Sequence, residues 1–172
     1  MKKISTLFIL LMVTFSFLFS QDATGDKKKR SVDPVKEKKV VDLVNRGIAF
    51  IKKNGLEKAV LAFQDPKGGF IDGEFYIFLY DFDGTALVVG SNTSLIGKNL
   101  INLSSTDRNG NKVYQVKELI NIAKTKGEGW FEWAWQNPET KKFGPKRGFA
   151  KKVTVKGKDY IIGSGYYLGD ED

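Results

Sequence analysis

The fold of this protein is decided by the stretch FYIFLYDFDGTALVV, residues 75–89. Aromatic and β-branched side chains dominate both halves of this stretch, which is typical of β-strands. Between the halves, the pair Asp83-Gly84 is a strong signal for a tight hairpin turn. The stretch therefore predicts two neighbouring antiparallel strands, one over 75–80 and one over 85–89.

Helical patterns flank these two strands. Upstream, Asp33-Pro34 combines a capping side chain with a proline at the first helical position, so it predicts the start of a helix. Apolar residues then recur at spacings of three and four as far as the stop signal Asn54-Gly55, and a second short helix is predicted over 56–63. Downstream, the same spacing over 113–123 predicts a helix that ends near Gly127.

The rest of the chain predicts three more strands, over 130–136, 148–155 and 160–167. Five strands joined mostly by short turns indicate an antiparallel sheet. The fold class is therefore α+β, with a long N-terminal helix and a second helix between strands two and three. We expect the helices to cover one face of the sheet and loops to cover the other, which leaves room there for a ligand pocket.

The N-terminus has the parts of an export signal. A basic start, Met1-Lys2-Lys3, is followed by an apolar run over 4–19 that is shorter than the ~20 residues of a typical membrane span. We expect a signal peptide over 1–20, a polar basic linker over 21–33 and one domain over 34–170. The protein is predicted to be periplasmic or secreted, and an uncleaved signal would instead anchor it to the membrane.

Composition excludes several kinds of function. The 172 residues include no cysteine and no histidine. Disulfides, thiolate or imidazole metal sites and histidine-dependent catalytic triads are therefore excluded. We expect no catalytic residues, no metal site and no cofactor. The net charge is +8, but basic residues are mostly interspersed with acidic ones, so we expect no nucleic-acid partner.

Several short motifs, in this order, resemble the single Cache domain. They are Tyr76–Gly84, Ile96–Leu100, Gly127–Trp130 with Trp133, Trp135, Asn137 and Pro138, Pro145–Arg147 and Gly163–Tyr167. Cache domains are the extracytoplasmic ligand sensors of bacterial chemoreceptors and sensor kinases. The resemblance covers about residues 36–170. It implies a PAS-like antiparallel sheet preceded by a long helix, and a pocket for a short-chain carboxylate such as acetate, propionate, pyruvate or lactate.

The resemblance also implies roles for particular residues. The family's pocket aromatics fall on Trp133 and Trp135, and its pocket lysine falls on Lys146. This chain departs from its relatives in having Val88-Val89 where they often carry a histidine, and Phe149 where they often carry a tyrosine.

Strand periodicity adds further candidates. Trp133 and Trp135 share a face because they are two residues apart, and Tyr76 shares a face with Phe78 and Tyr80. Lys146 and Arg147 point to opposite faces, so only one of these two cations can enter a pocket, and the same holds for Tyr166 and Tyr167. The candidate ligand-binding residues are Trp133, Trp135, Lys146, Arg147, Tyr76 and Tyr166.

We therefore expect an extracytoplasmic small-molecule sensory domain. Its ligand would be a short-chain carboxylate or a similar small organic molecule, because a cation beside aromatic side chains suits one. We expect it to lack a transmembrane output module of its own, with a membrane receptor as a candidate partner. The alternative is a signal-anchored accessory protein that uses the domain for protein–protein interaction without a small ligand.

Overall fold

The structure is a computed structural model that describes residues 32–169. The expected export signal and nearly all of the expected linker lie outside these residues. Among the described residues, no helix has both the length and the apolarity to span a membrane. The elements, in chain order, are α1 (Pro34–Asn54), α2 (Leu56–Gln64), β1 (Ile71–Asp72), β2 (Phe75–Tyr76), β3 (Phe78–Asp81), β4 (Ala86–Val89), the 3-10 helix η1 (Thr93–Leu95), β5 (Ser105–Thr106), β6 (Lys112–Val113), α3 (Gln115–Lys126), β7 (Glu128–Gln136), β8 (Phe143–Val155) and β9 (Lys158–Tyr167).

A five-stranded antiparallel sheet forms the centre of the molecule, with strand order β4-β3-β9-β8-β7. The predicted α+β class and the long N-terminal helix are confirmed. The predicted second helix is also confirmed: α3 follows the sheet strands β3 and β4 and precedes β7. The strand predicted over 75–80 is divided into β2 and β3. Tyr76 in β2 pairs with Ile71 of β1, whereas Phe78 in β3 pairs with Gly163 of the central strand β9.

Helices α1 and α2 cover one face of the sheet. The Asp33 Oδ1 atom accepts hydrogen bonds from the backbone nitrogens of Val35 at 2.9 Å and Lys36 at 3.1 Å, so it caps α1 as predicted. The buried stripe of these helices packs against alternate residues of the strands, because neighbouring side chains in a strand point to opposite faces. This first core cluster includes Val40, Val44, Ile51, Phe63, Ile77, Leu79, Val88, Phe149 and Ile162.

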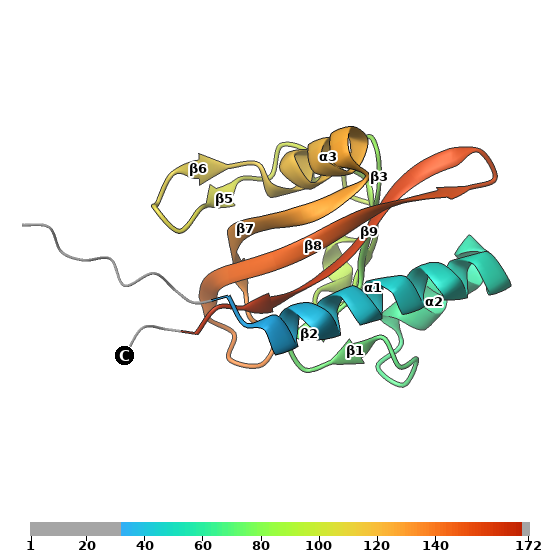
Figure 1. The fold of residues 1–172 in the computed structure, drawn as a ribbon, viewed down its shortest axis with the longest axis horizontal. Helices are drawn as coiled ribbons and strands as arrows, with labels where there is room; N and C mark the ends of the chain where they lie inside the picture. Colours follow the sequence, from blue (N-terminus) through green and yellow to red (C-terminus); the bar gives the residue numbers. More distant parts are fainter. Residues whose placement is uncertain (1–31, 170–172) are drawn as a thin grey trace, which may run out of the picture.

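Helix α3 covers the opposite face. Its buried residues Val116, Leu119, Ile120 and Ala123 form a second core cluster with Phe78, Tyr80, Ala150 and Ile161. Figure 1 shows α3 on one side of the sheet and α1 and α2 on the other. The expectation that all helices share one face is therefore wrong. Both faces carry apolar side chains at alternate strand positions, and each face needs a helix to exclude water from it.

Candidate ligand-binding site

A small cavity lies between the sheet and the N-terminal half of α3. With the side chains in the positions described, its free volume is about 10 Å³. This is room for about one water molecule. Aromatic rings from β2, β3 and β7 form most of its wall. We call it the inner cavity; its lining residues are Tyr76, Phe78, Tyr80, Val89, Gln115, Val116, Leu119, Trp133 and Trp135.

Lys146 lies beside this cavity and is completely buried. It is the cross-strand partner of Trp133 in β7 and of Tyr167 in β9, so these side chains share the α3 face of the sheet. The Lys146 Nζ atom stands 3.7 Å from the centroid of the Tyr76 ring and 4.9 Å from that of Tyr167. It has no hydrogen-bond partner among the described residues. The ammonium therefore lies against two aromatic faces.

Burial dominates the electrostatics of this lysine. It lowers the pKa of Lys146 because removal from water disfavours the charged form, and the nearby Tyr76 and Glu74 oppose only part of this shift. Burial also raises the pKa of the Tyr80 phenol. Phenol rings thus line the cavity, and beside it lies a buried lysine that makes no ion pair with a carboxylate among the described residues, which is a setting that favours an incoming anion.

Other buried polar atoms around the inner cavity also lack partners. The Trp133 indole Nε1 atom and both amide atoms of Gln115 make no hydrogen bond to any described residue. Trp133 is 5% exposed and Gln115 is 2% exposed, so water does not satisfy these atoms from outside. Unpaired buried polar atoms are rare in native proteins. Their gathering around one cavity is typical of a site that is completed by a ligand.

The structure brings four of the six candidate residues together. Tyr76, Trp133 and Trp135 line the inner cavity, and Lys146 contacts Tyr76. Arg147 and Tyr166 lie on the opposite face of the sheet, because each follows or precedes a cavity-side residue by one position in its strand. The Tyr166 hydroxyl accepts a hydrogen bond from the backbone nitrogen of Asp33 at 3.2 Å, at the start of α1.

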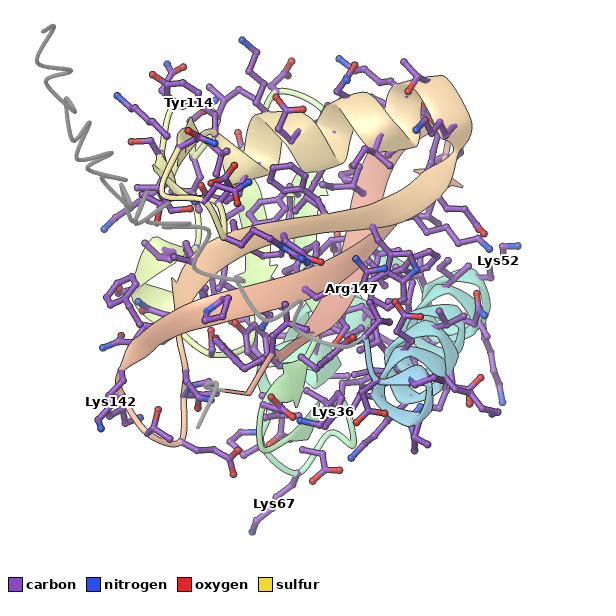
Figure 2. All side chains as sticks on the ribbon, turned by 60° about the vertical axis from the view of Figure 1, so that its left-hand side comes forward. Lys36, Lys52, Lys67, Tyr114, Lys142 and Arg147 are labelled. Carbon is purple, nitrogen blue, oxygen red and sulfur yellow. The ribbon has the colours of Figure 1, made fainter. Side chains whose placement is uncertain are left out.

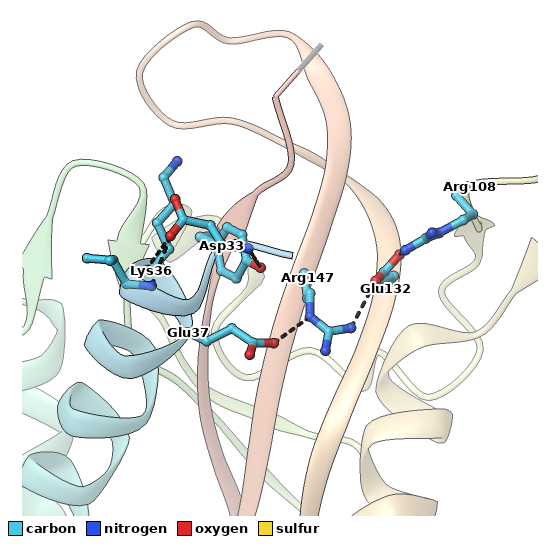
Figure 3. Close-up of polar contacts among 8 residues, drawn as sticks. Asp33, Lys36, Glu37, Arg108, Glu132 and Arg147 are labelled. Atoms are coloured by element: carbon cyan, nitrogen blue, oxygen red, sulfur yellow. Dashed lines mark hydrogen bonds and ion pairs between the residues drawn. The ribbon is translucent and has the colours of Figure 1, made fainter. Parts of the chain in front are cut away.

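Arg147 joins three elements on that opposite face. Its Nε atom donates to Glu37 Oε1 in α1 at 2.8 Å, and its Nη1 atom donates to Glu132 Oε1 in β7 at 2.9 Å. Arg108, beyond β5, donates to the other oxygen of Glu132 at 2.7 Å. Figure 3 shows this chain of charges. Burial opposes the charge of Arg147, but the two carboxylates more than offset it, so the pKa of the guanidinium is raised. Arg147 is thus fully engaged by protein groups.

Two residues beside the cavity were not predicted. Gln115 stands four positions before Leu119 on the apolar stripe of α3, and this position was the available signal that its side chain is buried. Tyr167, rather than Tyr166, contacts Lys146. Alternation alone allowed either tyrosine, because it does not say which face of β9 meets α3.

A second hollow adjoins the inner cavity, and we call it the outer groove. It has a volume of about 270 Å³, and Trp135 belongs to the walls of both hollows. Trp135 is therefore the lining residue that the two hollows share. The outer groove is lined by Ser91, Asn92, Leu95, Leu103, Ser104, Ser105, Ala134, Trp135, Gln136, Pro138, Lys141 and Phe143.

A much larger hollow, of about 560 Å³, runs along α1 beside β1 and β2. It is open, and none of its lining residues carries an unpaired buried polar atom. Four of its charged groups are already paired, Lys38 with Asp42 at 2.5 Å and Lys39 with Asp72 at 2.7 Å. Its Arg46 donates to the Gly69 carbonyl oxygen at 2.7 Å. The inner cavity is therefore the better candidate site despite its small volume.

Comparison with known proteins places this domain in a family. The sheet with helices on both faces and a small cavity under α3 define an α+β domain with a central antiparallel sheet. A family model described as the Cache domain matches residues 67–172, which is more than half of the chain. The chain belongs to the Cache domain family, as the sequence motifs predicted.

Individual relatives are sensor proteins. The sensor histidine kinase MctS of Rhizobium johnstonii is 36% identical over 95 residues, which cover 55% of this chain and 19% of the kinase. The chain thus spans about a fifth of that relative's length.

Two solved structures share the fold. A methyl-accepting chemotaxis protein from Vibrio parahaemolyticus has a TM-score of 0.63 at 24% identity, covering 78% of this chain and 89% of that one. A Cache chemosensory domain, solved for the structural basis of its carboxylic acid recognition, has a TM-score of 0.61 at 18% identity, covering 78% and 95%. The chain is therefore a Cache domain that shares its fold with these two chemotaxis-related proteins.

Proposed function

We propose that this protein is an extracytoplasmic sensory domain that binds a short-chain organic carboxylate in the inner cavity. The observation that carries the proposal is Lys146, a completely buried cation without a hydrogen-bond partner among the described residues. A carboxylate would bring both the missing counter-charge and acceptors for the ammonium.

The energetics favour an anionic ligand over a neutral or cationic one. A buried ammonium without a counter-charge is costly, and each unsatisfied buried polar group costs roughly 1–3 kcal/mol. The Trp133 Nε1 group is a donor only, as is the Lys146 ammonium. A carboxylate accepts from both, whereas an amine would add a second positive charge beside Lys146. Binding would therefore relieve costs that the unliganded fold carries.

The small volume limits the ligand and the way it enters. Free space of about 10 Å³ does not admit even a two-carbon acid unless a side chain moves. We infer that Trp135 swings toward the outer groove, where about 270 Å³ is free. The ligand then enters between β7 and the loop that follows β4. This enclosure favours the smallest organic acids.

Binding without catalysis is the activity that we assign. The chain is a Cache sensory domain, and its N-terminal sequence favours export, which would place the cavity outside the cytoplasm. A membrane receptor or kinase that responds to the bound state is the partner we propose, because the kinase relative contains a similar segment within a much longer chain.

Isothermal titration calorimetry of the purified protein tests the proposal. Acetate, propionate, pyruvate and lactate are titrated, with ethylamine as the cationic comparison. We expect at least one acid to bind and ethylamine to give no heat. The variant Lys146→Met should lose binding, whereas Lys142→Met should retain it, because Lys142 is exposed and points outward (Figure 2). Lack of binding by every acid, or equal affinity in Lys146→Met, would overturn the proposal and favour a protein-interaction module.

A further inference from the structure

Gln115 is a buried amide with no hydrogen-bond partner among residues 32–169. It is the first residue of α3 and is 2% exposed, and neither its Nε2 nor its Oε1 atom has a partner. It lines the inner cavity between the apolar α3 residues and the indoles of β7. A leucine at this position would complete the apolar stripe of the helix at no such cost. Apolar packing therefore does not explain why this position carries an amide.

The unpaired atoms at the inner cavity differ in what they require. The Lys146 Nζ and Trp133 Nε1 atoms are donors only, and the Gln115 Nε2 atom is a donor as well. The Gln115 Oε1 atom is the acceptor in this set. A plain carboxylate can satisfy the donors but leaves Oε1 without a hydrogen. Full satisfaction needs a ligand that also carries a hydrogen-bond donor.

We propose that Gln115 makes the inner cavity selective for small carboxylates that carry a hydroxyl group. This inference rests on the proposed function and deepens it. A hydroxyl group donates to Oε1 and accepts from Nε2, so it satisfies both amide atoms with one group. A keto oxygen accepts only and leaves Oε1 unpaired. An ammonium group donates only, leaves Nε2 unpaired and places a second cation near Lys146.

The discrimination arises from burial. A site whose buried polar atoms are built to bind a ligand hydroxyl rejects the analogue that lacks it, because those atoms are then left without partners. Gln115 is nearly inaccessible, so bulk water does not replace the missing group. We expect the hydroxyl acid to bind at least ~10-fold more tightly than the acid with the same carbon skeleton and no hydroxyl.

The test is a calorimetric series of four three-carbon acids with the purified protein: lactate, pyruvate, propionate and alanine. Lactate carries the hydroxyl, pyruvate a keto group, alanine an ammonium and propionate none of these. We expect lactate to bind most tightly. In Gln115→Leu, lactate and propionate should bind within about 2-fold of each other, because both amide atoms are gone. The matched control Gln64→Leu changes a glutamine of α2 on the other face and should keep the wild-type preference.

The outcomes separate this inference from the proposed function. Binding of propionate as tight as that of lactate by the wild-type protein would overturn the role of Gln115 alone. A lactate preference that survives in Gln115→Leu would do the same. Absence of binding by all four acids would overturn both. If Gln115→Leu does not fold, as judged by its thermal melt, the affinities of the wild-type protein for lactate and propionate decide whether the inference stands.

Discussion

Lys146 and Arg147 are neighbours in β8, yet they occupy opposite faces of the sheet and opposite electrostatic situations. The Lys146 Nζ atom makes no hydrogen bond to a described residue and lies 3.7 Å from the centroid of the Tyr76 ring. Arg147 is held by two carboxylates, from Glu37 and Glu132. Figure 2 shows Arg147 between the sheet and α1. The pair divides one short motif into a buried cation, which we propose to bind the ligand, and a structural one.

Replacing Lys146 with methionine should stabilise the unliganded protein. Methionine fills a similar volume without a buried charge, and removal of an unsatisfied buried group is worth about 1–3 kcal/mol. We expect a higher free energy of unfolding in urea and a complete loss of carboxylate binding. The control Lys142→Met should leave both quantities unchanged. A Lys146→Met protein that is less stable than the wild type would show that the ammonium already has a partner.

The stability of the unliganded protein should rise with pH in the alkaline range below pH 10. The pKa of Lys146 is lowered in the folded state from its ordinary value of 10.5, so between the lowered pKa and 10.5 the unfolded chain binds more protons. Raising the pH there favours the folded state. Burial raises the pKa of Tyr80 and Tyr167, which acts in the opposite sense only as the pH passes about 10.

Urea unfolding between about pH 7.5 and 9.5 measures this effect. The difference between wild type and Lys146→Met isolates the lysine, because both proteins carry the same tyrosines. That difference should shrink as the pH rises. A difference that is constant over this range would mean that the folded and unfolded states bind the lysine's proton equally there, so that folding does not lower its pKa into or below this range.

Replacing Arg147 with methionine should destabilise the fold without changing ligand affinity. The variant loses the hydrogen bonds to Glu37 at 2.8 Å and Glu132 at 2.9 Å. Because the Arg147 side chain is partly exposed, we expect the free energy of unfolding to fall by about 1–2 kcal/mol. In a double-mutant cycle with Glu37→Gln, the two changes should be non-additive. Weaker carboxylate binding in folded Arg147→Met would show that the two faces of the sheet are coupled.

Adding a methyl group at Gly148 should displace Trp133. A Cβ atom there would stand 2.4 Å from the Trp133 ring, whereas at Gly144 of the same strand the nearest atom is 3.8 Å away. We expect Gly148→Ala to cost about 1–3 kcal/mol through overpacking and to weaken ligand binding. Gly144→Ala should change neither stability nor affinity. Equal affinities of the two variants for the acid would remove Trp133 from the site.

Shortening Trp135 should open the inner cavity. Trp135→Ala removes the ring that lines both the cavity and the outer groove. Stopped-flow measurements should show faster association and much faster dissociation of the acid, because entry no longer waits for the indole to move. Unchanged rates in this variant would place the entrance elsewhere.

Much of the fold could be predicted from local patterns. Asp33 was identified as the cap of α1 from its type and its following proline, and it makes the capping bonds. The hairpin at Asp83-Gly84 forms where the turn signal stands, with Asp81 Oδ1 accepting from the backbone nitrogen of Asp83 at 3.1 Å. The placement of α3 was not predicted. The pattern of an amphipathic helix shows that one side of the helix is buried, but not on which face of the sheet the helix packs.

The sequence by itself determined that Lys146 and Arg147 lie on opposite faces, because side chains alternate along any strand. It also determined the class of the fold and the membership of the Cache family. Only the tertiary structure decided which face is which. Helix α3 packs on the face that carries Phe78 and Tyr80, so Lys146 and Gln115 lie beside the inner cavity. Arg147 therefore lies on the other face, where it bonds to Glu37 of α1. Such pairings depend on contacts between residues far apart in the chain, and local periodicity does not encode them.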